Sequence, residues 1–327
     1  MSEEQRQILE MLSEGKINAD EADRLLRIIN QPQSVNVETP TGSKWHHGHE
    51  RVWHHGHERV AVMVHPDADT EQGDTRDDVF AVGESPKLTV NGENGRIIVN
   101  SGDDGEIRVQ ARLRNPSRID YHVTQDGDTV RVEARQKRKA SLFGFHGMNT
   151  NIEITVTTPR NTNVELNTSN GRIELTGVEN SGKLESSNGS ISMKSVKGDF
   201  EATTHNSTIE LHDAEGSATL RTSNGRISME NVKGDFEAQT QNGAISFSGE
   251  FSPGSDNQIK TSNGSVRVKL QGTPSLKIDA TTSNGSITSK LSDMAASIDE
   301  KNHLVGTIGD GEAQLVIQTS NGAVSIE

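Results

Sequence analysis

The sequence predicts a mainly β protein, a parallel β-solenoid (β-helix) over residues 80–327, with each coil about 18–21 residues long. Three observations support this prediction: an asparagine corner that returns at a constant step, alternating segments that follow each corner, and a shortage of large core residues. Aromatic residues make up 3% of the chain and hydrophobic residues 30%, which is low for a globular enzyme. Such a composition favours a thin core spread along many coils over one deep core.

An Asn-Gly pair, or Asn-Ser in one coil, marks the repeat. Between the first five of these asparagines the step is constant at 18, and the next two steps are 21. A step of 37, close to two coils, then leads to Asn321. Stacked coils require a constant period, because each residue then lies above its counterpart in the preceding coil. The predicted corner ladder consists of Asn170, Asn188, Asn206, Asn224, Asn242, Asn263 and Asn284.

After each corner, apolar and polar residues alternate, which is typical of a strand with one face in the core. Asn-Gly is also the usual signal of a two-residue hairpin, so a series of isolated antiparallel turns is the alternative. Hairpins would not require one period with like residues at like places. The stacked arrangement predicts two inward ladders, one of Ile173, Ile191, Ile209, Ile227 and Ile245 and one of Phe200, Ala218 and Phe236.

We expect two properties of the asparagine corner and one of the chain end. Strand parity places each asparagine on the inward side, as a polar ladder whose amides satisfy backbone groups. The glycine that follows is expected to take the positive φ that a corner requires. The final strand, 323–326, is expected to leave an uncapped edge that pairs with a second copy of the chain.

Residues 1–31 predict a small α-helical hairpin in front of the coils. Apolar residues recur at helical spacing on both helices, and Leu9, Leu12, Leu25 and Leu26 are the predicted docking residues. Helices of roughly ten residues are too short to be stable alone in water, so these residues must pack against something. Two interpretations stay open: a cap packed on the same chain, or a module that oligomerises or docks onto a protein partner.

Residues 32–79 are interpreted as a flexible linker in which the octapeptide WHHGHERV occurs twice, at 45–60. Imidazole is a good ligand for zinc, nickel or copper, and dense histidine tracts are a compositional signal for metals. Adventitious binding of Zn, Ni or Cu is the one cofactor interpretation, and a neutral spacer is the alternative. The acidic stretch 67–78 is expected to be solvated. The candidate metal ligands are His46, His47, His49, His54, His55 and His57.

Charge and hydropathy exclude several classes of protein. The net charge of −14 disfavours nucleic acid as a partner, because phosphate backbones require a basic surface. No apolar run approaches the roughly 20 residues of a transmembrane segment. The N-terminus lacks the features of a secretory signal, so we expect a cytoplasmic protein. Peripheral association with the membrane, or a cell-surface position reached by non-classical export, is the alternative.

An enzyme is not expected. Some β-helices cleave polysaccharides, but that chemistry needs clustered acids, a base and often calcium on one outward face. Here the outward positions mix hydroxyl, amide and charged side chains without a local concentration of acids. Asp199 and Asp235 are predicted to lie two coils apart, at ~10 Å, which is too far to share a metal ion. A polysaccharide-acting enzyme is therefore only the third interpretation.

Two parts of the chain resemble known families. The front hairpin is similar to the short bacterial SHOCT module through Leu9, Leu12, Gly15-Lys16-Ile17, Glu21-Ala22 and Leu25-Leu26. Most of 80–327 resembles the bacterial "putative adhesin" domain through Asn94-Gly95, Val156-Thr157-Thr158-Pro159, Asn163-Val164-Glu165-Leu166 and Ser169-Asn170-Gly171. This two-part layout is that of LiaX- and YvlB-type proteins, and the resemblance implies a role in cell-envelope stress or surface sensing.

These observations favour a non-enzymatic bacterial scaffold or sensor, or an adhesin-like binding protein. In this interpretation a face of the solenoid binds the partner, and the helical hairpin oligomerises or docks. The alternative function is a metal-responsive binding protein that works through the six linker histidines.

Overall fold

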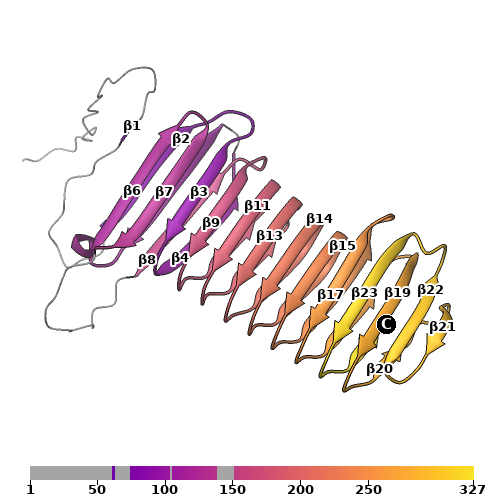
Figure 1. Cartoon of the computed structure of the whole chain (residues 1–327). Helices are drawn as coiled ribbons and strands as arrows, with labels where there is room; N and C mark the ends of the chain where they lie inside the picture. Colours follow the sequence, from indigo (N-terminus) through magenta and orange to yellow (C-terminus); the bar gives the residue numbers. More distant parts are fainter. Residues whose placement is uncertain (1–60, 63–73, 104, 138–150) are drawn as a thin grey trace, which may run out of the picture. The chain divides into compact units, whose positions relative to one another are not determined.

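The computed structural model describes residues 61–62, 74–103, 105–137 and 151–327 (Figure 1). These residues form strands and one short 3-10 helix, η1 (Pro116–Arg118). None of the helical segments in the described ranges is long and apolar enough to cross a membrane. The prediction of a mainly β chain is confirmed for this part of the protein.

The strands form two faces with the hydrophobic core between them, and each coil contributes to both. In order of pairing, face A contains β2 (Asp74–Ala81), β5 (Glu106–Leu113), β8 (Ile152–Thr158), β4 (Gly95–Ser101), β10 (Ile173–Thr176), β12 (Ile191–Lys194), the first parts of β14 (Ile209–Thr222) and β15 (Ile227–Thr240), β16 (Ile245–Phe251), β18 (Val266–Leu270), β24 (Val324–Ile326) and β20 (Ile287–Ser289).

Face B is built in the same way. In order of pairing it contains β1 (Ala61–Val62), β6 (Ile119–Asp126), β7 (Thr129–Gln136), β3 (Lys87–Gly92), β9 (Asn163–Thr168), β11 (Glu179–Ser186), β13 (Lys197–Thr204), the second parts of β14 and β15, β17 (Asp256–Thr261), β23 (Ala313–Thr319), β19 (Leu276–Thr282), β22 (His303–Ile308) and β21 (Ala295–Asp299). Because β14 and β15 run through the corner between the faces, the hydrogen bonding of the two faces is continuous there.

The central strands pair in parallel, each with the strand one coil further along the chain. On face A, Ile191 pairs with Ile173 on one side and Ile209 on the other, and the same register continues to Ile227 and Ile245. The predicted isoleucine ladder is therefore confirmed. Parallel pairing places each side chain ~4.8 Å from its counterpart, so identical apolar residues pack on one another along the stack.

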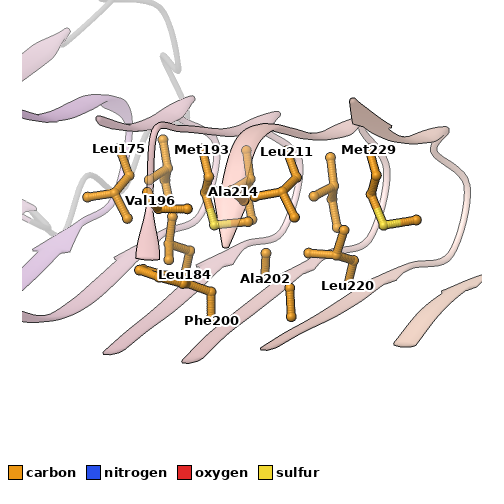
Figure 2. Packing of buried hydrophobic residues seen from close by; sticks show 14 of the residues in the cluster. Leu175, Leu184, Met193, Val196, Phe200, Ala202, Leu211, Ala214, Leu220 and Met229 are labelled. Atoms are coloured by element: carbon orange, nitrogen blue, oxygen red, sulfur yellow. The ribbon is translucent and has the colours of Figure 1, made fainter. Parts of the chain in front are cut away.

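Side chains from both faces meet in a narrow core. Figure 2 shows Leu175, Met193, Leu211 and Met229 of face A opposite Leu184, Ala202 and Leu220 of face B. All seven are buried. Burying one such aliphatic side chain stabilises the fold by roughly 1.5–3 kcal/mol, and the gain repeats at every coil.

Large and small residues alternate along the second predicted ladder, which is also confirmed. Phe200 pairs with Ala218, and Ala218 with Phe236, on face B. Gly182 precedes Phe200 in the same row, and an added Cβ there would lie 2.6 Å from the ring of Phe200. The absence of a side chain at Gly182 therefore leaves room for this ring in the narrow interior.

The glycines of the predicted ladder's Asn-Gly corners do not have the expected positive φ. They are required by close stacking instead, because a Cβ on Gly189 would overlap the carbonyl oxygen of Gly171 in the neighbouring coil. Left-handed residues lie at the opposite corner, between the end of the face A strand and the face B strand. There Ser195, Asp213 and Asn231 have φ of 53, 52 and 55° and recur at a step of 18.

The chain order breaks at the C-terminal end of the stack. Strand β23 lies between β17 and β19 (Figure 1), and β24 lies between β18 and β20. Val324 pairs with Val266 and Ile287 and is 1% exposed. The prediction of an uncapped edge at 323–326 is therefore wrong. Strands β19 and β20 precede the final coil in sequence but pair with its outer side, so they cover the edge that β23 and β24 would otherwise leave open.

A second break lies at the other end. Strands β3 and β4 pair with β9 and β10, although four further strands separate them in sequence. The intervening strands β5 to β8 lie on the far side of this first coil, where β2 and β6 add antiparallel pairs. Strand β2 begins at Asp74, earlier than the predicted start at 80, and Asp78 is buried rather than solvated. Charged residues on β2 mask the alternation of inward and outward positions, so the sequence did not predict this strand.

Candidate binding surface

The Asn-Gly corner is held from inside by a row of hydroxyl side chains. Thr204 Oγ1 donates to the carbonyl oxygen of Gly189 in the neighbouring coil at 3.0 Å, and Thr240 Oγ1 donates to that of Gly225 at 2.9 Å. These contacts satisfy carbonyl groups that the turn leaves outside the strand pairing. All residues of this row are buried, and all but Thr168 make such a bond: Thr168, Ser186, Thr204, Thr222, Thr240, Thr261, Thr282 and Thr319.

Sequence reasoning missed this row, although its signal is present. A serine or threonine stands two residues before every asparagine of the predicted ladder. It takes the last inward position of the strand, so the chain has already turned when it reaches the asparagine. This turn explains why the asparagines are exposed rather than on the predicted inward side.

The asparagine side chains form a continuous hydrogen-bonded ladder along the corner. Asn206 Nδ2 donates to Asn188 Oδ1 at 2.8 Å, and Asn224 Nδ2 donates to Asn206 Oδ1 at 2.8 Å. The ladder extends across both breaks in chain order, since Asn170 donates to Asn94 and Asn284 donates to Asn321. In order of contact its members are Asn94, Asn170, Asn188, Asn206, Asn224, Asn242, Asn263, Asn321 and Asn284.

Each amide in this ladder keeps hydrogen-bonding capacity toward solvent. A primary amide has two N–H donors and an oxygen with two lone pairs, and the ladder uses one of each. The second N–H and the second lone pair of each inner asparagine are available to a ligand. The corner therefore repeats the same donor and acceptor at every rung, a rung being the asparagine that one coil contributes to the ladder.

The corner also differs in charge from the rest of the protein. From the hydroxyl residue to the residue after the glycine, the eight coils from 168–172 to 319–323 contain no Asp or Glu. The charged residues there are Arg172 and Arg226, with His205 as a titratable neighbour, in a chain with a net charge of −14. We call this surface the Asn stripe: the asparagine ladder together with these flanking positions.

The outward surface of face B has a different chemistry, because many of its charged side chains form ion pairs across neighbouring strands. Arg221 contacts Glu237 at 2.8 Å, and Lys197 contacts Glu215 at 3.4 Å on the neighbouring strand. Exposed pairs of this kind contribute roughly 0–1 kcal/mol each.

Acidic side chains on face B are spread over several rungs. Asp199 and Asp235 lie on either side of Ser217, whose hydroxyl donates to Asp199. Partial shielding from water, together with the nearby carboxylate of Asp256, raises the pKa of Asp235. Among the described residues no group of three or more His, Asp or Glu side chains has the geometry of a metal site.

The N-terminal end of the stack contains the other perturbed groups. Arg108 holds Asp77 through bonds of 2.8 and 2.6 Å, and this interaction lowers the pKa of Asp77. Burial raises the pKa of Asp78 on β2 of face A and of Tyr121 on β6 of face B. These three groups lie on the end strands β2 and β6, which pair antiparallel with β5 and β7, far along the stack from Asp235.

The family described as Toastrack DUF4097 matches residues 86–327 of the chain. The chain belongs to the toastrack family. Residues 3–34 match a SHOCT-like domain, so the two-part resemblance seen in the sequence is confirmed. No curated protein matches the chain.

Several solved structures are similar to this toastrack protein at low identity. A "putative adhesin" from Bacteroides fragilis is 14% identical, with 79% of this chain and 98% of that one covered and a TM-score of 0.48. A "putative adhesin" from Parabacteroides merdae is 12% identical, with 77% and 96% covered and a TM-score of 0.33. A "putative lipid binding protein" from Parabacteroides distasonis is 13% identical, with 78% and 97% covered and a TM-score of 0.29. Similarity at this level assigns no ligand to this chain.

The remaining predicted site residues are not placed by the structure. The docking residues Leu9, Leu12, Leu25 and Leu26 lie in 1–60, outside the described residues of the toastrack protein. The six histidines of the linker lie in the same range. The structure therefore brings together only the asparagines among the predicted site residues.

Proposed function

We propose that this toastrack protein is a non-enzymatic binding scaffold, and that its coils act as a β-solenoid that receives an extended partner on the Asn stripe. One observation carries the proposal: an exposed amide ladder runs over nine rungs, with the same free donor and acceptor at each inner rung. Equivalent sites in a row suit recognition of a repeating partner.

The geometry of the corner favours binding over catalysis. Catalysis needs groups that converge on one reacting atom, whereas the groups of the stripe are displaced from each other by one rung each. The buried hydroxyl row holds the corner from inside, so the amides are preorganised and little conformational entropy is lost on binding. Both features support a static recognition surface.

The SHOCT-like hairpin gives the proposal its second part. We assign it the role of an oligomerisation or docking module, in which Leu9, Leu12, Leu25 and Leu26 bury their side chains against a protein partner or a second copy. Linking several stripes in one assembly would raise the apparent affinity for a long partner without any new contact. A scaffold of this kind suits a bacterial cell-envelope stress response, with the protein at the inner or outer surface of the envelope.

The test uses the full-length protein and isolated bacterial envelope fractions. We expect the wild type to co-sediment with envelope material and the triple variant Asn188→Ala, Asn206→Ala, Asn224→Ala to lose most of this binding. The matched control is Lys197→Ala with Glu215→Ala, which alters the same coils on face B and leaves the net charge unchanged. Equal binding by all three proteins would contradict the role of the stripe.

A metal-responsive binding function is the second candidate, because six histidines are concentrated in the duplicated octapeptide at 45–60. Calorimetry with zinc, nickel and copper compares the wild type with a variant that lacks residues 45–60. The hypothesis expects micromolar or tighter binding that the deletion abolishes. Equal affinities for the two proteins would refute it.

A further inference from the structure

We infer that the Asn stripe recognises an unbranched β-1,4-linked glycan that lies along the stack. The inference rests on the proposed binding function and names the class of partner. It follows from three properties of the stripe: its repeat distance, its mixed donor and acceptor character, and its lack of acidic groups.

The repeat distance separates the classes of extended polymer. Neighbouring rungs are ~4.8 Å apart, so the stripe offers its donor and acceptor at that interval. An extended peptide presents equivalent groups on one side only at every second residue, ~6.8 Å apart, and falls out of register with the rungs at once. Successive sugars of a straight β-1,4-linked chain alternate in orientation, so equivalent groups face one side at every second sugar, a distance close to the spacing of two rungs. Such a chain therefore stays in register over several rungs.

The hydrogen-bonding groups of the stripe are complementary to sugar hydroxyls. A hydroxyl group both donates and accepts, and each inner rung offers one N–H and one carbonyl oxygen on the same amide. The hydroxyl side chains of Ser187 and Ser262, one residue before their asparagines, are exposed and widen this polar surface. A lipid surface or an apolar helix would find only the methyl groups of Ala244 and Ala323 as apolar side chains after the corner glycines.

Charge favours the stripe over the two faces as the glycan site. Over the eight coils from 168–172 to 319–323 the stripe contains no Asp or Glu, so sugars that carry carboxylates meet no repulsion there. Arg226 lies within the stripe and makes no ion pair among the described residues, so it is available to an anionic substituent. On face B, by contrast, the exposed charges of Arg221, Glu201 and Glu237 are already paired with one another.

The same surface predicts how affinity depends on glycan length. Sugar-binding sites usually gain affinity from stacking on an aromatic ring, and the corner segments of the stripe, from 168–172 to 319–323, contain no Phe, Tyr or Trp. Each rung therefore contributes little, and several rungs must be occupied together. Binding should rise steeply from a disaccharide to a hexasaccharide.

Calorimetry with the full-length protein tests the inference. The probes are the hexamer and dimer of β-1,4-linked N-acetylglucosamine and the hexamer of α-1,4-linked glucose, whose curved chain cannot follow the rungs. We expect the β-1,4 hexamer to bind at least tenfold more tightly than either other probe. The variant Asn188→Ala, Asn206→Ala, Asn224→Ala should weaken hexamer binding at least tenfold, and Lys197→Ala with Glu215→Ala should leave it unchanged.

A second variant covers the case in which the triple variant does not fold. Ser187→Leu with Ser262→Leu keeps every asparagine and replaces two exposed hydroxyl groups beside the ladder by bulky side chains that neither donate nor accept, so it should also weaken hexamer binding at least tenfold. Absence of hexamer binding by the wild type, or unchanged binding by this variant, would overturn the inference. If the envelope fractions still bind in a stripe-dependent way, the glycan assignment fails alone. If stripe-dependent envelope binding is also absent, the proposed function fails with it.

Discussion

The central coils and the two ends of the stack share the same side-chain ladders, but the segments that contribute to these ladders follow each other in sequence only in the centre. In the central coils, strands that touch in space are one coil apart in sequence, a step of 18 or 21. At the ends, neighbouring rungs come from distant segments: Asn94 contacts Asn170, and Asn321 contacts both Asn263 and Asn284. The comparison shows that a segment can take a place in the stack if its side chains and backbone pair with those of its neighbours, whatever its position in the sequence.

The ends also differ from the centre in strand direction. Antiparallel pairs occur there, between β2 and β5, β6 and β7, and β19, β22 and β21. The outer strand β2 carries Asp74, Arg76 and Asp77, and β21 is exposed along most of its length. Charged residues on an outer strand oppose pairing with another chain, so the ends differ in chemistry from the repeating centre.

The largest effect is expected where the C-terminal coil is inserted between two others. Val324→Lys places a cation between Val266 and Ile287 with no acidic partner, and should lower the free energy of unfolding by about 3–5 kcal/mol. Urea denaturation measures the change. Ser325→Lys, on the outward side of the same strand, is the control and should cost less than about 1 kcal/mol. Unchanged stability in Val324→Lys would place β24 at an open edge.

A smaller loss is expected from a side chain in the left-handed corner of the central coils. Gly216 has a φ of 125°, and a Cβ there would overlap the carbonyl oxygen of Gly198. Gly216→Val should therefore cost about 2–4 kcal/mol, from backbone strain and steric overlap together. The control is Gly127→Ala at an end hairpin, where φ is 55° and no atom lies within 4 Å of the added Cβ. Its cost should be about 1 kcal/mol in thermal denaturation, from backbone strain alone. Equal losses would contradict tight stacking in the centre.

The hydroxyl row allows a direct comparison between the centre and its first coil. Thr240→Val removes the donor to Gly225 and should cost about 1–3 kcal/mol, because the buried carbonyl oxygen loses its partner. The buried Thr168 Oγ1 has no partner, so Thr168→Val should be neutral or slightly stabilising. Chemical denaturation of the two variants measures the difference. A loss of the same size in both would mean that packing of the threonine methyl group matters more than the hydrogen bond.

The smallest effect concerns pH. The raised pKa of Asp235 means that the folded chain holds its proton more tightly than the unfolded chain. As pH rises from the ordinary value of 3.8 through the raised pKa, the charged form is disfavoured in the fold and stability falls. Asp235→Asn should therefore be more stable than the wild type at pH 7, and the gain should disappear at lower pH.

The matched control for this prediction is Asp199→Asn. Its neighbours on the adjacent rungs are Ser181 and Ser217 rather than a second acid, so no comparable gain is expected. Thermal denaturation of both variants between pH 3 and 7 provides the measurement. A pH-independent gain in Asp235→Asn would show that the carboxylate's charge is not the cause.

Sequence reasoning predicted the repeating centre because the information there is local. The constant step of 18 places Ile173, Ile191 and Ile209 in one row, and the structure shows that row. It mistook the reason for the corner glycines, because φ is a property of one residue whereas the overlap at Gly189 involves a different coil. It also placed the asparagines inward, since parity alone does not reveal where the strand ends.

The amino-acid sequence by itself determined the family, the mainly β character, the period and the identity of the ladder residues. These properties depend on the alternation of apolar and polar residues and on the spacing of the corners, which can be read from the sequence without knowing which strands become neighbours. Only the tertiary structure decided the order of the coils at the ends, the outward direction of the amides and the buried bonds of the hydroxyl row. Each of those depends on which distant strand becomes the hydrogen-bonding neighbour, and backbone pairing between strands is the same whatever their separation in sequence.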